Sequence, residues 1–595
     1  MEQKIQQPQQ KKITKRPIIN FCQGVAVTLF LLATALIICL IIAYCTSRKP
    51  LTSYAIVFDA GSSHTEMFVY HWPADKSEGL GTTSTVNEYF VCPLSSVTYI
   101  DPERPTEITK LKAISDFEQH VNLLAAYFRP CLEKAMSRIP SDRHKFSPVF
   151  LGATAGMRLS LLHNATRAKN VLESIREVFS NSPFQFVVNR QVRILTGMEE
   201  AIDGWITTNI LLEKFTKLHA KNKRKRSQNE FDSNMVGVLD LGGASTQVTF
   251  THLNDIDDEP IPPDFTTNIT LFDTVYSPYA HSYLCWGKNE ALKRYRARLL
   301  NAALNTGRNY FTTSKNLHIR DPCLANGTND TVTVNSLFRS PCTANEKQRY
   351  LTYTNKTSFK FIGSGNATQC RQAILNLFDA KRNDLTVNCT YKQDYCTFDD
   401  TFQPKLPEDI KFIALSGYYY VFNNLAHGMK KPDGFTAERY HYRDFPQEEI
   451  DRRLINVCET DYSTFYTQES MTPSNEPHKR SLCFDAWYMW LLLTYAIGFT
   501  ESDLKRLTFA NTFPTGKVGW TLGYMINQTN YIPAEFREKA LTKNSFIGLL
   551  SGSLVLILIT FLFLLLTCYL CLKKRSARTT KNKDGYTEAT EQANV

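Results

Sequence analysis

The chain has 595 residues, enough for several domains or for one large unit of two lobes, and it carries a net charge of +11. The first 20 residues contribute +4 of this charge and residues 573–595 contribute +3, which leaves +4 for the long middle of the chain. Because so small a charge is not the electrostatic footprint of a nucleic-acid-binding protein, no nucleic-acid partner is expected.

Two apolar segments lie near the ends of the chain. Residues 24–44 are uncharged, and residues 546–572 form a second apolar run that three basic residues follow at once. Both are long enough to span a bilayer, and the basic residues before the long first run favour an anchor over a cleaved signal peptide. Basic residues outside both spans place the tails, 1–23 and 573–595, in the cytoplasm. The two helices also offer surfaces for a homo-oligomer.

The segment between the spans has the composition expected of an oxidising, glycosylating compartment. All eight Asn-x-Ser/Thr sequons lie there, at Asn164, Asn268, Asn326, Asn329, Asn355, Asn366, Asn388 and Asn527. Ten of the fifteen cysteines lie there too: Cys92, Cys131, Cys285, Cys323, Cys342, Cys370, Cys389, Cys396, Cys458 and Cys483. An even number of cysteines in such a region predicts five disulfides.

Residues 54–65 form the first stretch that indicates a chemistry. An apolar strand runs to Asp59, and a turn with Gly61 and two hydroxyl residues follows. Glycine lets the backbone approach a phosphate closely, and a carboxylate at the strand end can hold the metal or water that accompanies it. A single turn of this kind is weak support for phosphate binding.

The next segments predict ordinary elements. Apolar residues from Leu111 to Leu124 recur at spacings of three and four, which predicts an amphipathic helix that ends at Pro130. A strand at 148–152 then runs into a turn of small residues, in which the Thr154 hydroxyl is free to meet a phosphate.

Two adjacent glutamates open a predicted helix at 196–205. Thr196 and Glu199 have the spacing of a capping box, in which the glutamate turns back to cap the helix. Glu200 has no such structural role, and its side chain points about 100° away around the helix. Glu200 is therefore the glutamate available for chemistry.

A second turn of the Asp59 type occurs at residues 236–250, where a buried strand reaches Asp240 and then a turn with glycines and hydroxyl residues. Two copies in one chain suggest two similar lobes that grip one polyphosphate between them. Residues 223–226, just before this strand, are all basic. They form either a solvated surface loop or a protease-processing site.

These stretches resemble a known family. The paired turns are similar to those of the actin, Hsp70 and sugar-kinase group of two-lobed ATP-binding proteins. More specifically, 59–65, 152–158, 196–205, 240–247 and 517–525 resemble, in order, the five conserved regions of the nucleoside triphosphate diphosphohydrolases, or apyrases. The resemblance covers about residues 50–540, with Ala201 where the family usually has glycine. A P-loop ATPase is not expected, because the chain has no Walker A sequence.

The resemblance implies an α/β fold of two ribonuclease-H-like lobes of the actin/Hsp70 type. The active site would lie in the cleft between the lobes, and transmembrane helices would flank the lobes at both ends. Residues 50–196 and 511–544 would form lobe I, and residues 197–510 would form lobe II.

The resemblance also assigns roles to residues. Glu200 would deprotonate the attacking water with the help of Ser245 and Gln247. A Ca²⁺ or Mg²⁺ ion would be held, largely through water, by Asp59 and Asp240. The groups that bind phosphate would be Ser62, Ser63, His64, Thr154, Gly243 and Ala244.

The remaining implications concern the base, the cleft and the disulfides. Among three adjacent tyrosines, Tyr419 would stack on the nucleobase, and Trp520 would lie beside the phosphate turns. A basic residue would cover the other face of the base. The candidates are His478, Lys479 and Arg480, of which the spacing to Cys483 favours His478. The implied disulfides are Cys92–Cys131, Cys285–Cys342, Cys323–Cys370, Cys389–Cys396 and Cys458–Cys483.

The chain is thus similar to an ecto-apyrase that hydrolyses extracellular ATP, ADP, UTP and UDP to the monophosphate. The two anchors match the cell-surface members, which implies a multi-pass plasma-membrane protein with its catalytic domain outside and both termini in the cytoplasm. A Golgi or lumenal nucleoside diphosphatase remains the alternative within the family. A non-catalytic nucleotide-binding surface receptor is a further alternative, against which Glu200 argues. The sequons argue against a cytosolic, sugar-kinase-like transferase.

Overall fold

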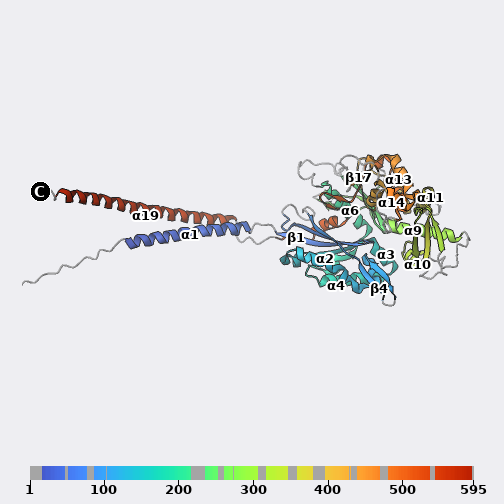
Figure 1. Cartoon of the computed structure of the whole chain (residues 1–595), viewed down its shortest axis with the longest axis horizontal. Helices are drawn as coiled ribbons and strands as arrows, with labels where there is room; N and C mark the ends of the chain where they lie inside the picture. Colours follow the sequence, from blue (N-terminus) through green and yellow to red (C-terminus); the bar gives the residue numbers. More distant parts are fainter. Residues whose placement is uncertain are drawn as a thin grey trace, which may run out of the picture. The chain divides into compact units, whose positions relative to one another are not determined.

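The structure is a computed structural model, and it describes residues 16–46, 51–76, 86–101, 104–215, 235–251, 260–271, 274–305, 317–345, 358–379, 395–427, 429, 439–468, 480–535 and 543–591. The chain separates into two compact units, whose elements Figure 1 labels. One unit consists of Met1–Leu51 with Glu535–Val595, and the other of Thr52–Ala534.

The first unit is a pair of long helices, α1 (Arg16–Thr46) and α19 (Lys543–Glu591), which contact each other. By length and composition, Gly24–Tyr44 and Lys543–Leu570 can each cross a membrane. The buried residues of both helices recur every seven positions, which is the repeat of a left-handed helix pair. They are Ala26, Ala33 and Leu40 on α1, and Ser553, Thr560 and Thr567 on α19.

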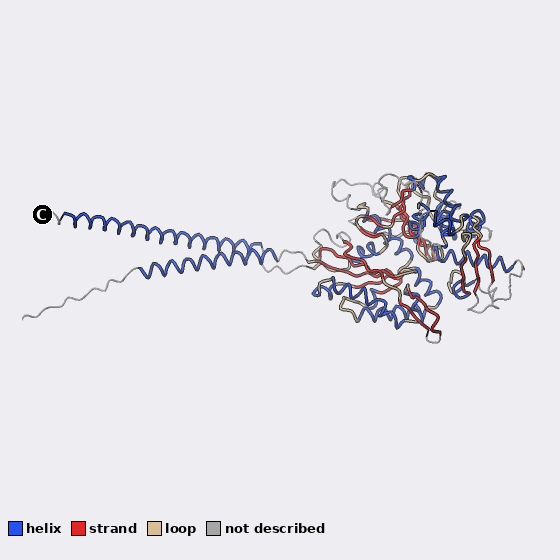
Figure 2. Tube along the Cα trace, in the orientation of Figure 1, coloured by secondary structure: helices blue, strands red, loops and turns tan. Residues whose placement is uncertain are grey.

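The second unit contains two sheets of the same design, whose strands Figure 2 draws in red. The first sheet has the order β3-β2-β1-β6-β7. Strands β1, β2 and β3 form an antiparallel meander, and β6 and β7 continue the sheet parallel to β1. The strands are β1 (Thr52–Ala60), β2 (Thr65–Pro73), β3 (Asn87–Pro93), β6 (Val149–Ala153) and β7 (Val192–Ile194).

The second sheet repeats this order as β12-β9-β8-β16-β18 and adds β17 at one edge. Here β8, β9 and β12 form the antiparallel meander, and β16 and β18 lie parallel to β8. The sequence-based expectation of two similar lobes is therefore correct at the level of strand order. The strands are β8 (Gly237–Leu241), β9 (Ser245–Phe250), β12 (Tyr279–Leu284), β16 (Phe412–Ser416), β17 (Arg439–His441) and β18 (Leu507–Ala510).

Helices cover both sheets, and α6 with α18 lies between them. Helix α6 contacts α18 and strands β8, β9 and β12, while α18 also contacts β1 and β2. The expected lobe boundaries, 196/197 and 510/511, divide no helix or strand. The helices of this unit are α2 (Leu124–Arg138), α3 (Ala155–His163), α4 (Ala165–Ser180), α5 (Val188–Gln191), α6 (Gly197–Leu211), α9 (Lys288–Asn305), α10 (Val334–Phe338), α11 (Ala367–Asp379), α12 (Gly417–Ala426), α13 (Gln447–Glu459), α14 (Tyr462–Gln468), α16 (Leu482–Leu491), α17 (Glu501–Leu504) and α18 (Thr521–Gln528).

Three smaller sheets complete the unit together with the pair β4–β5. A three-stranded sheet has the order β13-β15-β14, and the other two are the hairpins β10–β11 and β19–β20. The bounds are β4 (Val97–Asp101), β5 (Arg104–Leu111), β10 (Ile269–Leu271), β11 (Thr274–Tyr276), β13 (Leu317–Asp321), β14 (Asn329–Thr333), β15 (Ser358–Gly363), β19 (Thr512–Phe513) and β20 (Gly516–Lys517).

The helix predicted from Leu111 to Pro130 is wrong. Strand β5 ends at Leu111, short 3₁₀ turns follow, and α2 begins only at Leu124 and continues through Pro130 to Arg138. Leu111, Phe117 and Leu124 are all buried in the core. Their regular spacing arises because 3₁₀ turns, with three residues per turn, also bring every third or fourth side chain to the core. The helix continues across Pro130 because packing of an apolar face outweighs intrinsic propensity.

Four disulfides lie among the described residues, and all four are pairs implied by the resemblance. They are Cys92–Cys131, Cys285–Cys342, Cys323–Cys370 and Cys458–Cys483. Cys389, the expected partner of Cys396, lies outside the described residues. Two of the bridges touch, because the Sγ atoms of Cys370 and Cys483 are 3.9 Å apart.

Six of the sequon asparagines are described, and each reaches the surface. Asn164 and Asn366 are half-buried, because their side chains accept hydrogen bonds at the starts of α4 and α11 from the N–H groups of Arg167 and Gln369. The other four, Asn268, Asn326, Asn329 and Asn527, are exposed. Asn355, Asn388 and the basic run 223–226 lie outside the described residues, and glycosylation remains a prediction.

Candidate active site

Two equivalent carboxylates stand at the ends of β1 and β8. Asp59 is the second-to-last residue of β1, and Asp240 is the second-to-last residue of β8. Each strand turns into an antiparallel partner, β2 or β9, and each has a parallel neighbour, β6 or β16, on its other side. The two aspartates therefore occupy the same place in two copies of one topology.

Ser62 lies where three of the expected phosphate-binding stretches meet. A Cβ added to Gly156 would lie 2.8 Å from Ser62 Cα, and one added to Gly243 would lie 2.7 Å from Ser62 Oγ. Real Cβ atoms do not approach other atoms so closely, so Gly156 is required by the Ser62 backbone, while a side chain at position 243 would displace the Ser62 hydroxyl. The first, second and fourth stretches are thus in contact at Ser62, although about 180 residues separate the outermost two.

Burial and nearby carboxylates raise the pKa values of the two aspartates. Burial raises the pKa of Asp59 to about 7, and Glu200, Glu66 and Asp240 act in the same direction, while the Trp520 indole acts against them. Burial likewise raises the pKa of Asp240 to about 6, with a further contribution from Glu200. The pKa values of both aspartates are thus raised by burial and by the negative charge of neighbouring carboxylates.

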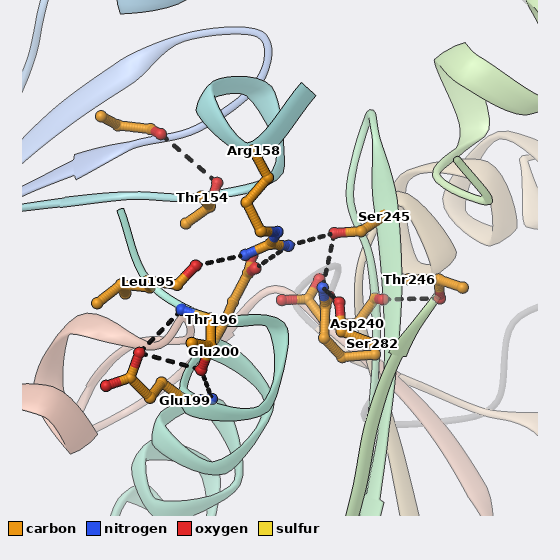
Figure 3. Close-up of polar contacts among 12 residues, drawn as sticks. Thr154, Arg158, Leu195, Thr196, Glu199, Glu200, Asp240, Ser245, Thr246 and Ser282 are labelled. Carbon is orange, nitrogen blue, oxygen red and sulfur yellow. Dashed lines mark hydrogen bonds and ion pairs between the residues drawn. The ribbon is translucent and has the colours of Figure 1, made fainter. Parts of the chain in front are cut away.

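The two adjacent glutamates have the separate roles predicted for them in the helix. Thr196 and Glu199 form the expected capping box at the start of α6, with the Glu199 carboxylate accepting the Thr196 N–H at 2.8 Å. Glu199 also pairs with Arg193 at 2.8 Å. Glu200 takes no part in the cap, and its carboxylate faces the group of polar side chains that Figure 3 shows around Arg158.

Arg158 is a central residue of this site that the sequence analysis did not single out. Its guanidinium donates hydrogen bonds to the Leu195 carbonyl at 3.0 Å, to the Glu200 carboxylate at 2.8 Å and to Ser245 Oγ at 3.3 Å (Figure 3). Burial raises the pKa of Glu200, and Arg158 opposes this effect. The available signal was its place four residues after Thr154, at the end of the second conserved stretch.

The network continues into the second sheet. Gln247 donates from Nε2 to Ser245 Oγ at 2.7 Å and to Ser282 Oγ at 2.9 Å. Ser245 and Gln247 are both buried, and they lie on β9 next to the Asp240 turn. The structure therefore connects Glu200 to both predicted helper residues through Arg158.

The other predicted phosphate ligands vary in exposure. Ser63 and His64 are exposed on the first turn and contact each other at 3.1 Å, while Ala244 is buried. Thr154 is also buried, and its hydroxyl donates to the Ala60 carbonyl at 3.5 Å. A cavity of about 410 Å³ opens beside Ser62 and Ala244, with Lys293 and Arg339 in its wall.

A divalent cation fits the residues present. The Oδ1 atom of Asp240 is buried and has no hydrogen-bond partner among the described residues. The raised pKa values of Asp59 and Asp240 arise from burial and from other carboxylates, and a bound cation removes both penalties. Carboxylate oxygens are the ligands that Ca²⁺ and Mg²⁺ prefer.

The proposed base-binding group is described only in part. Tyr419 is 7% exposed and packs against Tyr420 and Tyr440, whereas Tyr420 is 53% exposed. Tyr419 as the base-stacking residue therefore stays a prediction, and Tyr420 is the more accessible neighbour. Arg480 is half-buried just before α16, but His478 and Lys479 lie outside the described residues.

Trp520, the expected cleft residue, lies beside the strand that carries Asp59. Its indole is buried and stands against the first sheet, so close to Gly152 that a Cβ there would lie 2.3 Å from Trp520 Cη2. Since Gly152 pairs with Asp59 in the sheet, Trp520 forms part of the wall around that carboxylate.

The fold is two-lobed and of the actin-like class, with paired aspartate turns at equivalent strand ends and a glutamate held by an arginine beside them. The chain belongs to the GDA1/CD39 (nucleoside phosphatase) family, whose model matches residues 46–544. It is therefore an enzyme of the class that the five conserved stretches predicted.

Individual relatives agree with this assignment. The chain is 31% identical to the mouse protein named ectonucleoside triphosphate diphosphohydrolase 3, over 93% of this chain and 94% of that protein. It is 33% identical to the bovine ectonucleoside triphosphate diphosphohydrolase 1, over 82% of this chain and 84% of that protein. The solved structure of nucleoside triphosphate hydrolases from Neospora caninum is 13% identical, with a TM-score of 0.52, over 85% of this chain and 97% of that chain. That likeness concerns the fold, and it confirms the expected fold class.

Proposed function

We propose that this enzyme hydrolyses extracellular nucleoside tri- and diphosphates (ATP, ADP, UTP and UDP) to the monophosphate and phosphate. The observation that carries the proposal is the meeting of two equivalent aspartate turns beside a glutamate that Arg158 links to Ser245. Two turns from two lobes suit a chain of two or three phosphates, because each lobe can hold a different phosphate.

In the proposed reaction Glu200 is the general base. It takes a proton from a water molecule whose oxygen attacks the terminal phosphorus. The bond from that phosphorus to the bridging oxygen breaks as the new bond forms, and the nucleotide leaves one phosphate shorter. Ser245 and Gln247 orient the water. Arg158 favours the ionised form of Glu200, because its positive charge lowers a pKa that burial raises.

The phosphate groups would be held by the turns themselves. Backbone N–H groups at Gly243 and Ala244, with the hydroxyls of Ser62, Ser63 and Thr154 and the His64 ring, would neutralise the developing charge. Ca²⁺ or Mg²⁺ held by Asp59 and Asp240 would supply further charge neutralisation at the phosphate oxygens. Tyr419 would bind the nucleobase.

We further propose that the enzyme lies in the plasma membrane as a multi-pass protein with Thr52–Ala534 outside and both termini in the cytoplasm. Support comes from the two apolar helices at the chain ends, from the basic residues beyond them and from sequon asparagines that reach the surface. The paired helices also provide the surface through which a homo-oligomer would form.

A phosphate-release assay on intact cells tests the proposal. Cells that display the protein should release phosphate from ATP, ADP, UTP and UDP but not from AMP, and an excess of chelator should abolish the release. Asp240→Asn should reach the cell surface and lack this activity. Activity seen only after permeabilisation would favour the lumenal diphosphatase, and no release in either condition would favour the non-catalytic receptor.

Topology has its own test. Glycosidase treatment of intact cells should reduce the apparent mass, and tags at either terminus should be undetectable until the cells are permeabilised. A terminal tag detected on intact cells would contradict the two-anchor arrangement.

A further inference from the structure

The exposed aromatic side chains of the second unit are unevenly distributed. Among its described residues, five tyrosine or phenylalanine side chains are at least 36% exposed: Tyr89 (42%), Phe146 (43%), Tyr420 (53%), Tyr495 (36%) and Tyr531 (77%). Single exposed aromatics are ordinary on a protein surface. Three of these five, however, gather at one end of the first sheet.

That end is where β1 begins and β2 finishes, and there Thr52 pairs with Pro73. Tyr54 on β1 pairs with His71 on β2, two positions further along the strands. The Tyr89 ring lies beside this pair, with its centroid 5.6 Å from that of Tyr54 and 5.4 Å from that of His71.

Phe146 and Tyr531 lie at the same end. Phe146 closes a short 3₁₀ helix (Ser141–Phe146) that contacts β1, and two residues later the Pro148 carbonyl accepts the Ile56 N–H at 2.9 Å. Tyr531 is next to Ile532, whose carbonyl accepts a hydrogen bond from Lys76 Nζ. The Lys76 N–H donates to the Pro73 carbonyl at 3.1 Å, which places this segment at the same end of the sheet.

The chain enters and leaves the second unit at this same end. Thr52 is six residues beyond Thr46, the last residue of α1, and Ile532 is eleven residues before Lys543, the first residue of α19. Six residues span at most about 20 Å, so Thr52 cannot lie far from the end of the apolar helix before it. Asp59, by contrast, lies seven residues along β1, about 23 Å from this end at the usual rise of a strand.

Exposed basic side chains accompany the aromatic ones. Lys145 Nζ lies 5.0 Å from the centroid of the Phe146 ring, and Arg138, whose carbonyl accepts the Tyr89 hydroxyl at 3.4 Å, is also exposed. Asp142 is the exposed acidic residue of the same 3₁₀ segment. Amphipathic rings with nearby cations are the composition of protein surfaces at the membrane–water interface, where rings sit among headgroups and cations meet phosphates.

We propose that Tyr89, Phe146 and Tyr531, with Lys145 and Arg138, form a surface that rests on the phospholipid headgroup layer. The proposal depends on the two-anchor topology proposed above, because the short segments that join α1 and α19 to the second unit would bring this end to the membrane. It goes beyond the anchors because it assigns the folded unit its own lipid contact. That contact fixes which end of the first sheet faces the bilayer and keeps the Asp59 end away from it.

Site-specific photocrosslinking in the full-length protein tests this surface. p-Benzoylphenylalanine is placed singly at Tyr89, Phe146 and Tyr531, and as matched controls at Tyr495 and Leu162, which are exposed elsewhere in the unit. A further variant carries the probe at Leu32, an exposed residue of the apolar part of α1, to report the anchor itself. Each protein is reconstituted in phosphatidylcholine nanodiscs, irradiated and analysed by peptide mass spectrometry.

Lipid adducts are expected at four positions and not at the two controls, Tyr495 and Leu162. The four are Tyr89, Phe146, Tyr531 and Leu32. Adducts at Leu32 alone would overturn the proposed surface while leaving the anchor in place. Equal adducts at all positions of the second unit would also overturn it, because the contact would then be non-specific. No adduct at Leu32 would remove the topology on which the proposal rests.

Discussion

The Arg158 guanidinium lies 2.8 Å from the Glu200 carboxylate and 3.3 Å from Ser245 Oγ, and so joins helix α3 to a group on helix α6 and a group on strand β9. Both Arg158 and Glu200 are largely buried, with side-chain exposures of 14% and 12%. Burial raises the pKa of the Glu200 carboxyl and the Arg158 charge lowers it, so this ion pair influences the pKa of that group.

Replacing Arg158 with methionine should move the pH dependence of the reaction. Arg158 lowers the pKa of Glu200 against the effect of burial, so its loss raises that pKa and protonates the base at a higher pH. The acid limb of the kcat profile should therefore shift to higher pH, with greater loss of activity at acidic than at alkaline pH. Arg158→Lys, which keeps the charge, should shift the limb less. A profile that falls equally at all pH values would contradict this role.

The two glutamates should differ sharply in kinetics. Glu200→Gln should lower turnover by about 10²- to 10⁴-fold, the usual contribution of a general base, with little change in nucleotide affinity. Glu199→Gln should cost at most about 1 kcal/mol of helix capping, since glutamine can fill the same role in the capping box. Ala201→Gly should leave activity unchanged or slightly higher. Normal turnover in Glu200→Gln beside an inactive Glu199→Gln would reverse the assignment.

Without a cation, the unfolding temperature should fall as pH rises. The folded-state pKa values of about 7 for Asp59 and about 6 for Asp240 lie above the ordinary 3.8, so the folded protein binds protons that the unfolded chain does not. The resulting stabilisation is complete below about pH 3.8 and is lost as pH rises through about 6 to 7.

Thermal unfolding in excess chelator, measured from about pH 5 to about pH 8, tests this prediction. Excess Ca²⁺ or Mg²⁺ should flatten the slope, because the ionised carboxylates are then neutralised. Asp240→Asn should reduce the slope in chelator, since one of the two titrating groups is gone. An unfolding temperature that rises with pH in chelator would contradict the sign.

Loss of one disulfide should rearrange its neighbour. In Cys458→Ser the thiol of Cys483 is left 3.9 Å from Cys370 Sγ. Its thiolate can attack that sulfur, which forms a Cys370–Cys483 bond and releases Cys323 as a thiol. Non-reducing peptide maps should contain this new pair, and the protein should lose about 2–5 kcal/mol of stability. The double variant Cys458→Ser/Cys483→Ser should retain Cys323–Cys370, and a map of the single variant without the new pair would contradict exchange.

An ion pair outside the catalytic network should influence substrate binding. Glu118 precedes α2 and accepts hydrogen bonds at 2.6 Å from Arg339, which follows α10, and at 2.5 Å from Ser160. Its side chain is only 4% exposed, so Arg339→Ala leaves a buried carboxylate oxygen unpaired, at a cost of about 1–3 kcal/mol. We expect KM to rise more than kcat falls, because this pair joins elements on the two sides of the cavity beside Ser62. An unchanged KM, or a fall in kcat alone, would contradict the idea.

The repeated turns were predictable from sequence because their chemistry is local. Asp59 and Asp240 each end a short apolar run and precede glycines, and this order of residues is enough to place them at strand ends. The capping box was equally local, since Thr196 and Glu199 are one helical turn apart.

Arg158 and the course of residues 111–138 were not predictable in this way. The importance of Arg158 depends on Glu200 and Ser245, which lie 42 and 87 residues further along the chain. The apolar residues after Leu111 have the spacing of an α-helix. That spacing shows only which side chains are buried, and the two successive 3₁₀ helices found there bury the same side chains.

Lys76 ties the last residues of the second unit, through the Thr529 and Ile532 carbonyls, to the lobe that begins at Thr52. Both membrane connections therefore leave from one lobe, and the lobe built on β8 is attached only through the other. A change in the angle between the two lobes would therefore require no change in the distance between Thr52 and Ile532, where the chain enters and leaves the unit. A force applied at both ends of the unit would act on the first lobe directly, and it would reach the second lobe through contacts between the two, such as those of α18 with α6.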